Sequence, residues 1–304
     1  MRTLKRLLLT VSMCCLVATA NAGPMVDSVL KENAREQSNL KLRTMVSAVA
    51  IVPVQEFQRV EQITPLDPSK VNAKTNPNAV ALIIGVESYL SLPQAQYANS
   101  DATHFYGYAT QVLGVSPNKI NLLIDAKASR TNLFKAMKDW MRTEVVNGKS
   151  DVYIFFAGHA LALADGSKTY LLPADGDRDL LDETSILIDD LVASAKGAKT
   201  ITLFLDTDFS GGAGINEYLS NVTILAASSG SQLSSTYEAA QHGLFSYWLM
   251  KGLEGEADAN KDKKITTGEL HEFVARQVGP IAQRRNRQQD PQLMGDGTRV
   301  LVSY

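Results

Sequence analysis

Residues 79–84 have the sequence Ala-Val-Ala-Leu-Ile-Ile, a continuous apolar run that ends at Gly85. A run of this kind is typical of a strand buried on both faces of a parallel sheet. Comparable apolar runs follow at 120–124, 152–156, 200–205 and 222–227. Apolar residues at helical spacing predict helices at 101–113, 133–146, 244–253 and 269–278. Strands that alternate with helices predict an α/β fold, a three-layer sandwich with helices on both faces of a mostly parallel sheet.

The first 22 residues have the pattern of a secretory signal peptide. Arg2, Lys5 and Arg6 precede the apolar run 7–17, and Ala-Asn-Ala at 20–22 gives an A-x-A cleavage site. We therefore expect a secreted or periplasmic protein. Removing these residues would change the net charge from −2 to −5, and this acidity disfavours a nucleic-acid partner. No apolar run reaches the roughly 20 residues that a membrane span needs.

The composition and the turn-forming residues of the sequence divide the rest of the chain into two parts. The 304 residues are 45% apolar and 20% charged, which is ordinary for a globular protein. We expect an N-terminal segment and linker at 23–78 and the main domain at 79–304. The chain has two cysteines, Cys14 and Cys15, and both lie in the signal. The mature chain is thus expected to contain neither a disulfide nor a thiol nucleophile.

Polar residues follow the third and fourth apolar runs. His159 comes after the run 152–156, and Asp206 and Asp208 come after the run 200–205. Ligands of parallel sheets bind outside the carboxyl ends of the strands, so these side chains are candidates for chemistry. A structural histidine and turn-capping carboxylates are the alternative.

Five stretches in the same order resemble the caspase-like cysteine peptidases (peptidase C14; caspases, metacaspases and paracaspases), in particular bacterial caspase-domain members. They are Ile-Ile-Gly-Val-Glu-Ser-Tyr at 83–89, Gly-His at 158–159, Tyr-Leu-Leu-Pro-Ala-Asp at 170–175, the stretch 206–212, and His-Gly-Leu-Phe-Ser at 242–246. The resemblance covers residues 79–304 and implies a caspase-like sheet.

The resemblance also implies site residues. His159 matches the family's catalytic histidine, whereas Asp208 stands at the position of the cysteine nucleophile. A carboxylate is a weak nucleophile, and its attack on an amide would give an anhydride that reverts easily. The resemblance therefore predicts an inactive pseudo-peptidase that serves as a binding or regulatory module.

Substrate recognition is better preserved than catalysis. Metacaspase-like members hold Arg or Lys in an acidic pocket, and the matching acids in this sequence are Asp101 and Asp206. Two carboxylates facing one pocket favour a guanidinium, which predicts a peptide or protein partner with an exposed Arg or Lys. A helix-dipole role for Asp101 is the alternative reading.

The alternative hypothesis is that the chain is catalytically active. Asp206, Asp208 and His159 could form a two-carboxylate, one-imidazole metal site and support metal-assisted hydrolysis, which would make the chain an active hydrolase of the same clan. The remaining histidines, among them His242, have no ligand spacing and are predicted to be structural, and the basic cluster at 284–287 is predicted to be a solvated loop.

Residues 258–269 fit the twelve-residue calcium loop of an EF-hand. The predicted ligand positions are occupied by Asp258, Asn260, Asp262, Lys264, Thr266 and Glu269. Lys263 stands at the position where glycine normally makes the sharp turn, so it must adopt a conformation that glycine reaches without cost. We expect weak calcium binding, and a polar loop that binds nothing is the alternative.

Overall fold

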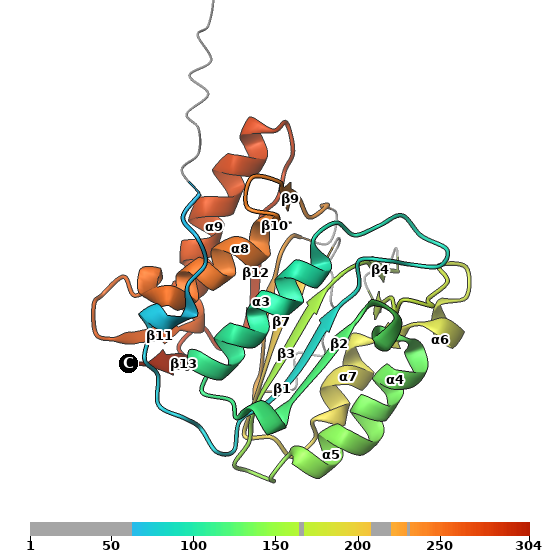
Figure 1. The fold of residues 1–304 in the computed structure, drawn as a ribbon, viewed down its shortest axis with the longest axis horizontal. Coiled ribbons are helices and arrows are strands. Elements are labelled where there is room, and N and C mark those ends of the chain that lie inside the picture. The colour runs from blue at the N-terminus through green and yellow to red at the C-terminus, as the bar shows by residue number, and fades with distance from the viewer. Residues whose placement is uncertain (1–62, 164–166, 208–219, 230–231) are drawn as a thin grey trace, which may run out of the picture. The chain divides into compact units, whose positions relative to one another are not determined.

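The computed structural model describes residues 63–163, 167–207, 220–229 and 232–304 (Figure 1). Among these residues, six strands form the central sheet in the order β12-β8-β7-β3-β1-β2. Their bounds are β1 Val80–Gly85, β2 Ile120–Ile124, β3 Asp151–Ala157, β7 Thr200–Asp206, β8 Val222–Ala226 and β12 Gln292–Gly295. All pairs are parallel except β12 with β8, which is antiparallel. The predicted signal peptide and Asp208 lie outside the described residues.

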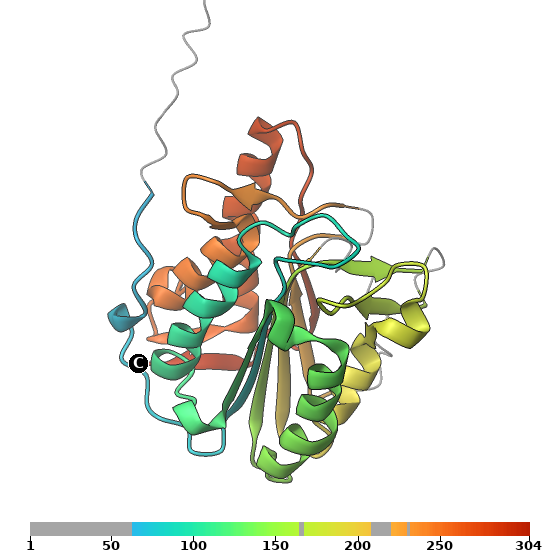
Figure 2. The same cartoon turned by 45° about the vertical axis from the view of Figure 1, so that its right-hand side comes forward.

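The sheet is covered on both faces, so the predicted three-layer α/β fold is confirmed. One face carries α3 (Ala98–Gln111), α8 (Leu244–Lys251) and α9 (Thr267–Arg284), and the other carries α4 (Arg130–Lys135), α5 (Met141–Glu144) and α7 (Ile188–Ser194) (Figures 1 and 2). Alternation along β1 explains why its run is apolar throughout. Ala81 and Ile83 belong to one core, while Leu82 and Ile84 belong to the other.

Two predicted helices differ from the observed ones. The helix predicted at 133–146 is divided into α4, a π-helical turn η4 (Ala136–Trp140) and α5. The helix predicted at 269–278 continues through Pro280 to Arg284 as α9. Proline normally disfavours a helix interior, but Ile281 and Ala282 are buried in the core, and this packing holds the last turns.

Small elements surround the sheet. The short strands are β4 Ala160–Ala162, β5 Thr169–Leu171, β6 Ile186–Leu187, β9 Thr236–Tyr237, β10 His242–Gly243, β11 Lys264–Thr266 and β13 Val300–Ser303. The other helical turns are η1 Pro68–Lys70, η2 Pro117–Lys119, η3 Asp125–Ala128, α6 Leu181–Thr184 and η6 Gly252–Glu256. No helix in the described residues is long and apolar enough to cross a membrane.

Residues 63–78, which the sequence assigns to a linker, pack onto the sheet domain. Val71 is buried in the core. The buried carboxylate of Glu254 accepts hydrogen bonds from the Asp67 backbone (2.7 Å), the Lys70 ammonium (2.6 Å) and the Tyr108 hydroxyl (2.6 Å). The same carboxylate pairs with buried Lys251. The compact unit accordingly begins at Ile63.

Candidate functional site

The carboxyl ends of β3 and β7 lie side by side at the upper edge of the sheet in Figure 1, and a cavity of about 480 Å³ opens there. The backbone N–H of Gly158 donates to the carbonyl of Asp206 (3.2 Å) and holds the two strand ends together. The lining contains His159 and Asp206 from the strand ends and Asp101 from α3. Three residues that the sequence singles out thus share one cavity.

The ring of His159 is held by the segment that follows β1. Its Nε2 lies 2.9 Å from the carbonyl oxygen of Pro93, and its centroid lies 4.9 Å from that of Tyr89. A carbonyl oxygen only accepts, so Nε2 of His159 carries a proton and donates to it. A Cβ at Gly158 would lie 2.5 Å from the Tyr89 hydroxyl, so glycine permits this close approach.

The carboxylates of Asp101 and Asp206 converge on Gly243. A Cβ at Gly243 would lie 2.2 Å from Oδ2 of Asp206 and 3.0 Å from Oδ2 of Asp101. Asp206 accepts hydrogen bonds from the Ser234 hydroxyl (2.6 Å) and from the backbone (3.1 Å) and hydroxyl (2.7 Å) of Ser246. Asp101 accepts from the Gly243 backbone (3.0 Å). Both acids are therefore fixed by the start of α8, whose N-terminal amides favour negative charge.

Burial determines the protonation states around this pair. The Asp101 side chain is only 2% exposed, and burial together with the neighbouring Asp206 raises the pKa of Asp101 well above its usual range. Nδ1 of His242 lies 2.7 Å from Oδ1 of Asp101. Burial lowers the pKa of His242 to about 4, so its ring is neutral at pH 7. The contact is a hydrogen bond, and His242 brings no positive charge to the two acids.

Comparison with known proteins identifies the family. A family model described as the caspase domain matches residues 78–302. The chain belongs to the caspase-domain family. A solved structural-genomics protein from Geobacter sulfurreducens resembles this caspase domain with 15% identity and a TM-score of 0.54, over 72% of this chain and 93% of that one. Caspase-1 from Spodoptera frugiperda resembles it with 15% identity and a TM-score of 0.52, over 79% and 96% of the two chains.

These comparisons bear on the fold and the family. At 15% identity the two solved structures show a shared fold. No curated protein gives a significant match to the chain. The predicted membership of the caspase-like family and the caspase-like sheet are confirmed by the family match and the fold match.

Asp208, which the resemblance assigns to the position of the nucleophile, lies outside the described residues. Within the described residues, no group of three His, Cys, Asp or Glu side chains is arranged to hold a metal ion. Asp206, one of the three proposed ligands, is held by the two serine side chains described above. The metal-assisted alternative depends on Asp208 and stays a prediction.

Sequence reasoning missed several groups around the acid pair. His242 is predicted to be isolated, yet it contacts Asp101. Ser234 and Ser246 support Asp206 and have no signal of their own in the sequence. Arg287, predicted to belong to a solvated loop, is exposed as expected but also lines the cavity. The His-Gly pair at 242–243 belongs to one of the stretches that resemble the caspase-like family, and this resemblance could have indicated the role of His242.

The loop 258–269 has the turn that its sequence predicts. Lys263 adopts a positive φ of 63°, which confirms the expected strain at the position where EF-hands have glycine. The carboxylate of Asp258 accepts hydrogen bonds from the backbones of Asp262 (3.2 Å) and Lys263 (3.0 Å) and from the Tyr304 hydroxyl (3.0 Å).

The expected closing ligand of that loop has another partner. Glu269 forms a capping box with Thr266 at the start of α9, with its Oε2 3.0 Å from the Thr266 backbone nitrogen. No three carboxylates of the described residues converge there. Both capping-box hydrogen bonds to the Glu269 carboxylate go to Oε2, and calcium binding stays a prediction.

Proposed function

We propose that this caspase domain binds an exposed Arg or Lys side chain of a peptide or protein and does not cleave it. The observation that carries the proposal is the convergence of Asp101 and Asp206 on Gly243 in the wall of one cavity. A cationic side chain entering that cavity would meet two fixed carboxylates, and a guanidinium could bind them by charge-assisted hydrogen bonds.

The electrostatics of the cavity support a cationic ligand. Among the described residues, Asp101 contacts the ring of His242, which is neutral at pH 7 and therefore does not form an ion pair with it. Burial, and after it the neighbouring Asp206, raises the pKa of Asp101, so its charged form is destabilised by lost hydration and by repulsion from Asp206. A bound cation would reduce the repulsion between the two carboxylates, and this reduction would contribute to the binding free energy.

The proposal of inactivity rests on the missing sulfur. The chain has two cysteines, both in the predicted signal at positions 14 and 15, and the position that matches the family's nucleophile is Asp208. Thiolate attack on the amide needs that sulfur, and a carboxylate would form an anhydride that reverts. We therefore assign the domain a binding or regulatory role in a secreted or periplasmic protein.

A binding experiment with fluorescence anisotropy tests the proposal. A labelled peptide with one central Arg should bind the wild-type protein, and Asp206→Asn should weaken binding about 30-fold or more, since losing one partner of a buried charge pair costs about 2 kcal/mol or more. Asp139→Asn, an exposed acid on the opposite side of the sheet, is the matched control. Equal affinity of the Asp206→Asn variant would overturn the pocket assignment.

The same peptides, with and without calcium or zinc, test inactivity. We expect no cleavage, and no effect of thiol alkylation on binding. Turnover that disappears in His159→Ala would overturn the proposal of an inactive domain. Turnover that requires zinc and is lost in Asp208→Ala would replace it with the metal-assisted hydrolase.

A further inference from the structure

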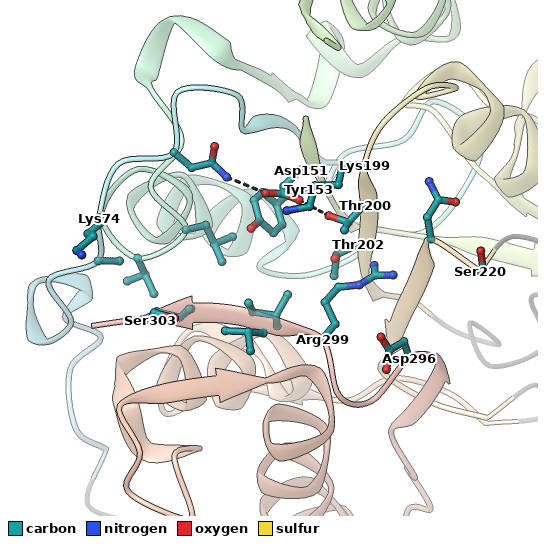
Figure 3. A pocket seen from close by; sticks show the side chains of 18 residues that line it. Lys74, Asp151, Tyr153, Lys199, Thr200, Thr202, Ser220, Asp296, Arg299 and Ser303 are labelled. Atoms are coloured by element: carbon teal, nitrogen blue, oxygen red, sulfur yellow. Dashed lines mark hydrogen bonds between the residues drawn. The ribbon is translucent and has the colours of Figure 1, made fainter. Parts of the chain in front are cut away.

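A second cavity, of about 600 Å³, lies at the other end of the same two strands (Figure 3). Asp151 begins β3 and Thr200 begins β7, and both line this cavity, whereas the last residues of these strands, Ala157 and Asp206, line the first one. Six steps of about 3.3 Å along a strand place the two cavities about 20 Å apart. This amino-end cavity is therefore a separate site, closed on one side by β13.

The amino ends of β3 and β7 carry polar side chains on one face. Asp151 pairs in register with Thr200, and Tyr153 pairs with Thr202. The carboxylate of Asp151 is occupied, because it accepts hydrogen bonds from Asn76 (2.8 Å) and from the hydroxyl of Thr200 (2.7 Å). Tyr153 and Thr202 also line the cavity, but their hydroxyls have no comparable hydrogen-bond partners among the described residues.

These two hydroxyls lack partners. Thr202 is 1% exposed, and its Oγ1 has no hydrogen-bond partner in the part of the chain that the structure describes. The Tyr153 hydroxyl also makes no hydrogen bond to the described residues, and burial raises its pKa, so it keeps its proton and can donate. A buried polar group without a partner is costly and points to a ligand that supplies one.

A cation stands beside these hydroxyls. Figure 3 shows the Arg299 side chain, from the residue just before β13, pointing toward Thr202. Arg299 is partly buried, and its guanidinium donates to the carbonyl of Ile201 (3.1 Å). No carboxylate of the described residues lies within ion-pairing distance of it. Burial lowers the pKa of Arg299, and the more distant Asp296 and Asp151 offset this in part. Its planar fork suits a ligand with two acceptor oxygens.

The rest of the lining limits the kind of anion. Apolar side chains from the end of α3 and from β13 form another wall, namely Val112, Leu113, Leu301 and Val302. The charged side chains of the lining are three cations, Arg299, Lys74 and Lys199, and two acids, Asp151 and Asp296. Their sum is one positive charge, which a singly charged carboxylate balances better than a doubly charged phosphate. We propose that the amino-end cavity binds a small carboxylic acid with an apolar body, its carboxylate on Arg299 and its oxygens within reach of the Tyr153 and Thr202 hydroxyls.

Calorimetric titration with hexanoate tests this site. We expect saturable binding to the purified protein, about tenfold or more weaker binding to Arg299→Gln, and weaker binding of hexanamide, which has the same body without the charge. Thr202→Val keeps the shape of the side chain and should weaken binding severalfold, so the test stands even if Arg299→Gln folds poorly. Arg142→Gln, an exposed arginine on α5, is the matched control and should bind as the wild type does.

Two results would overturn the assignment. Equal hexanoate affinity in wild type, Arg299→Gln and Thr202→Val, or no saturable binding, would show that these groups do not form a carboxylate site. Tighter binding of inorganic phosphate than of hexanoate, lost in Arg299→Gln, would show a phosphate site instead. An unchanged affinity for the Arg peptide in the Thr202→Val variant would keep this outcome separate from the proposed function.

Discussion

Replacing Gly243 by alanine tests the geometry of the acid pair. The backbone of Gly243 has φ −61° and ψ 142°, which alanine adopts without strain. Conformational entropy alone would then make Gly243→Ala stabilising by about 0.4–1 kcal/mol. The new Cβ, however, would lie 2.2 Å from Oδ2 of Asp206, so the carboxylate must move by about 1 Å or more to reach ordinary contact.

That movement is resisted by the hydrogen bonds from Ser246 at 2.7 Å and 3.1 Å. Overpacking costs about 1–3 kcal/mol, and weakening a hydrogen bond to a charged group costs about 1.5–3 kcal/mol. After the entropic gain, we expect Gly243→Ala to lower the free energy of unfolding by about 2–4 kcal/mol. Urea unfolding followed by circular dichroism measures it.

The matched control is Gly107→Ala, because Gly107 lies inside α3 and a Cβ there would lie 3.4 Å from Cγ of Pro68, an ordinary van der Waals contact. This variant should be stabilised by about 1 kcal/mol, the usual difference between alanine and glycine in a helix. If Gly243→Ala is stabilised to the same extent as the control, the carboxylates do not crowd Gly243 and the reasoning is refuted.

Three further predictions concern the catalytic position, the calcium loop and the histidine beside the pocket. Asp208→Cys should cleave reporter peptides after Arg or Lys in a manner that depends on His159, whereas cleavage after Asp would contradict the acidic pocket. Calcium should raise the melting temperature only above about 10⁻⁴–10⁻³ M, and an equal rise in Glu269→Ala would mean that the loop binds no calcium. Because the folded-state pKa of His242 is about 4 and its unfolded value is 6.5, its contribution to stability is present above pH 6.5 and lost as pH falls through 4. The stability advantage of wild type over His242→Gln should shrink by about 2–3 kcal/mol over that range, and an advantage that grows would contradict a neutral, buried ring.

Most of the order of strands and helices could be predicted from the sequence because β1, β3, β7 and β8 are buried on both faces. The side chains of the run at 79–84 point alternately into the two cores, so all of them are apolar and the strand is easy to recognise in the sequence. The short strands β9, β10, β11 and β13 could not be predicted in the same way. Each has two to four residues, too few to show a period, and each pairs through tertiary contacts.

Part of the candidate site could be predicted from the sequence for the same reason. His159 and Asp206 follow recognisable strands, so the parallel sheet brings them together. The contact of His242 with Asp101 joins positions 141 residues apart, and no local pattern carries it. The amino-end cavity is a similar case, because Arg299 meets Thr202 and Tyr153 only after the end of the chain packs under the sheet.

Isothermal titration of the purified protein with a short Arg peptide and with the same peptide carrying citrulline tests the central claim most directly. Citrulline keeps the size and shape of arginine but has no charge, so the comparison isolates the contribution of Asp101 and Asp206. We predict that the Arg peptide binds about tenfold or more tightly than the citrulline peptide at pH 7, and that it is recovered uncleaved. Equal affinities for the two peptides would contradict an acidic pocket for basic side chains.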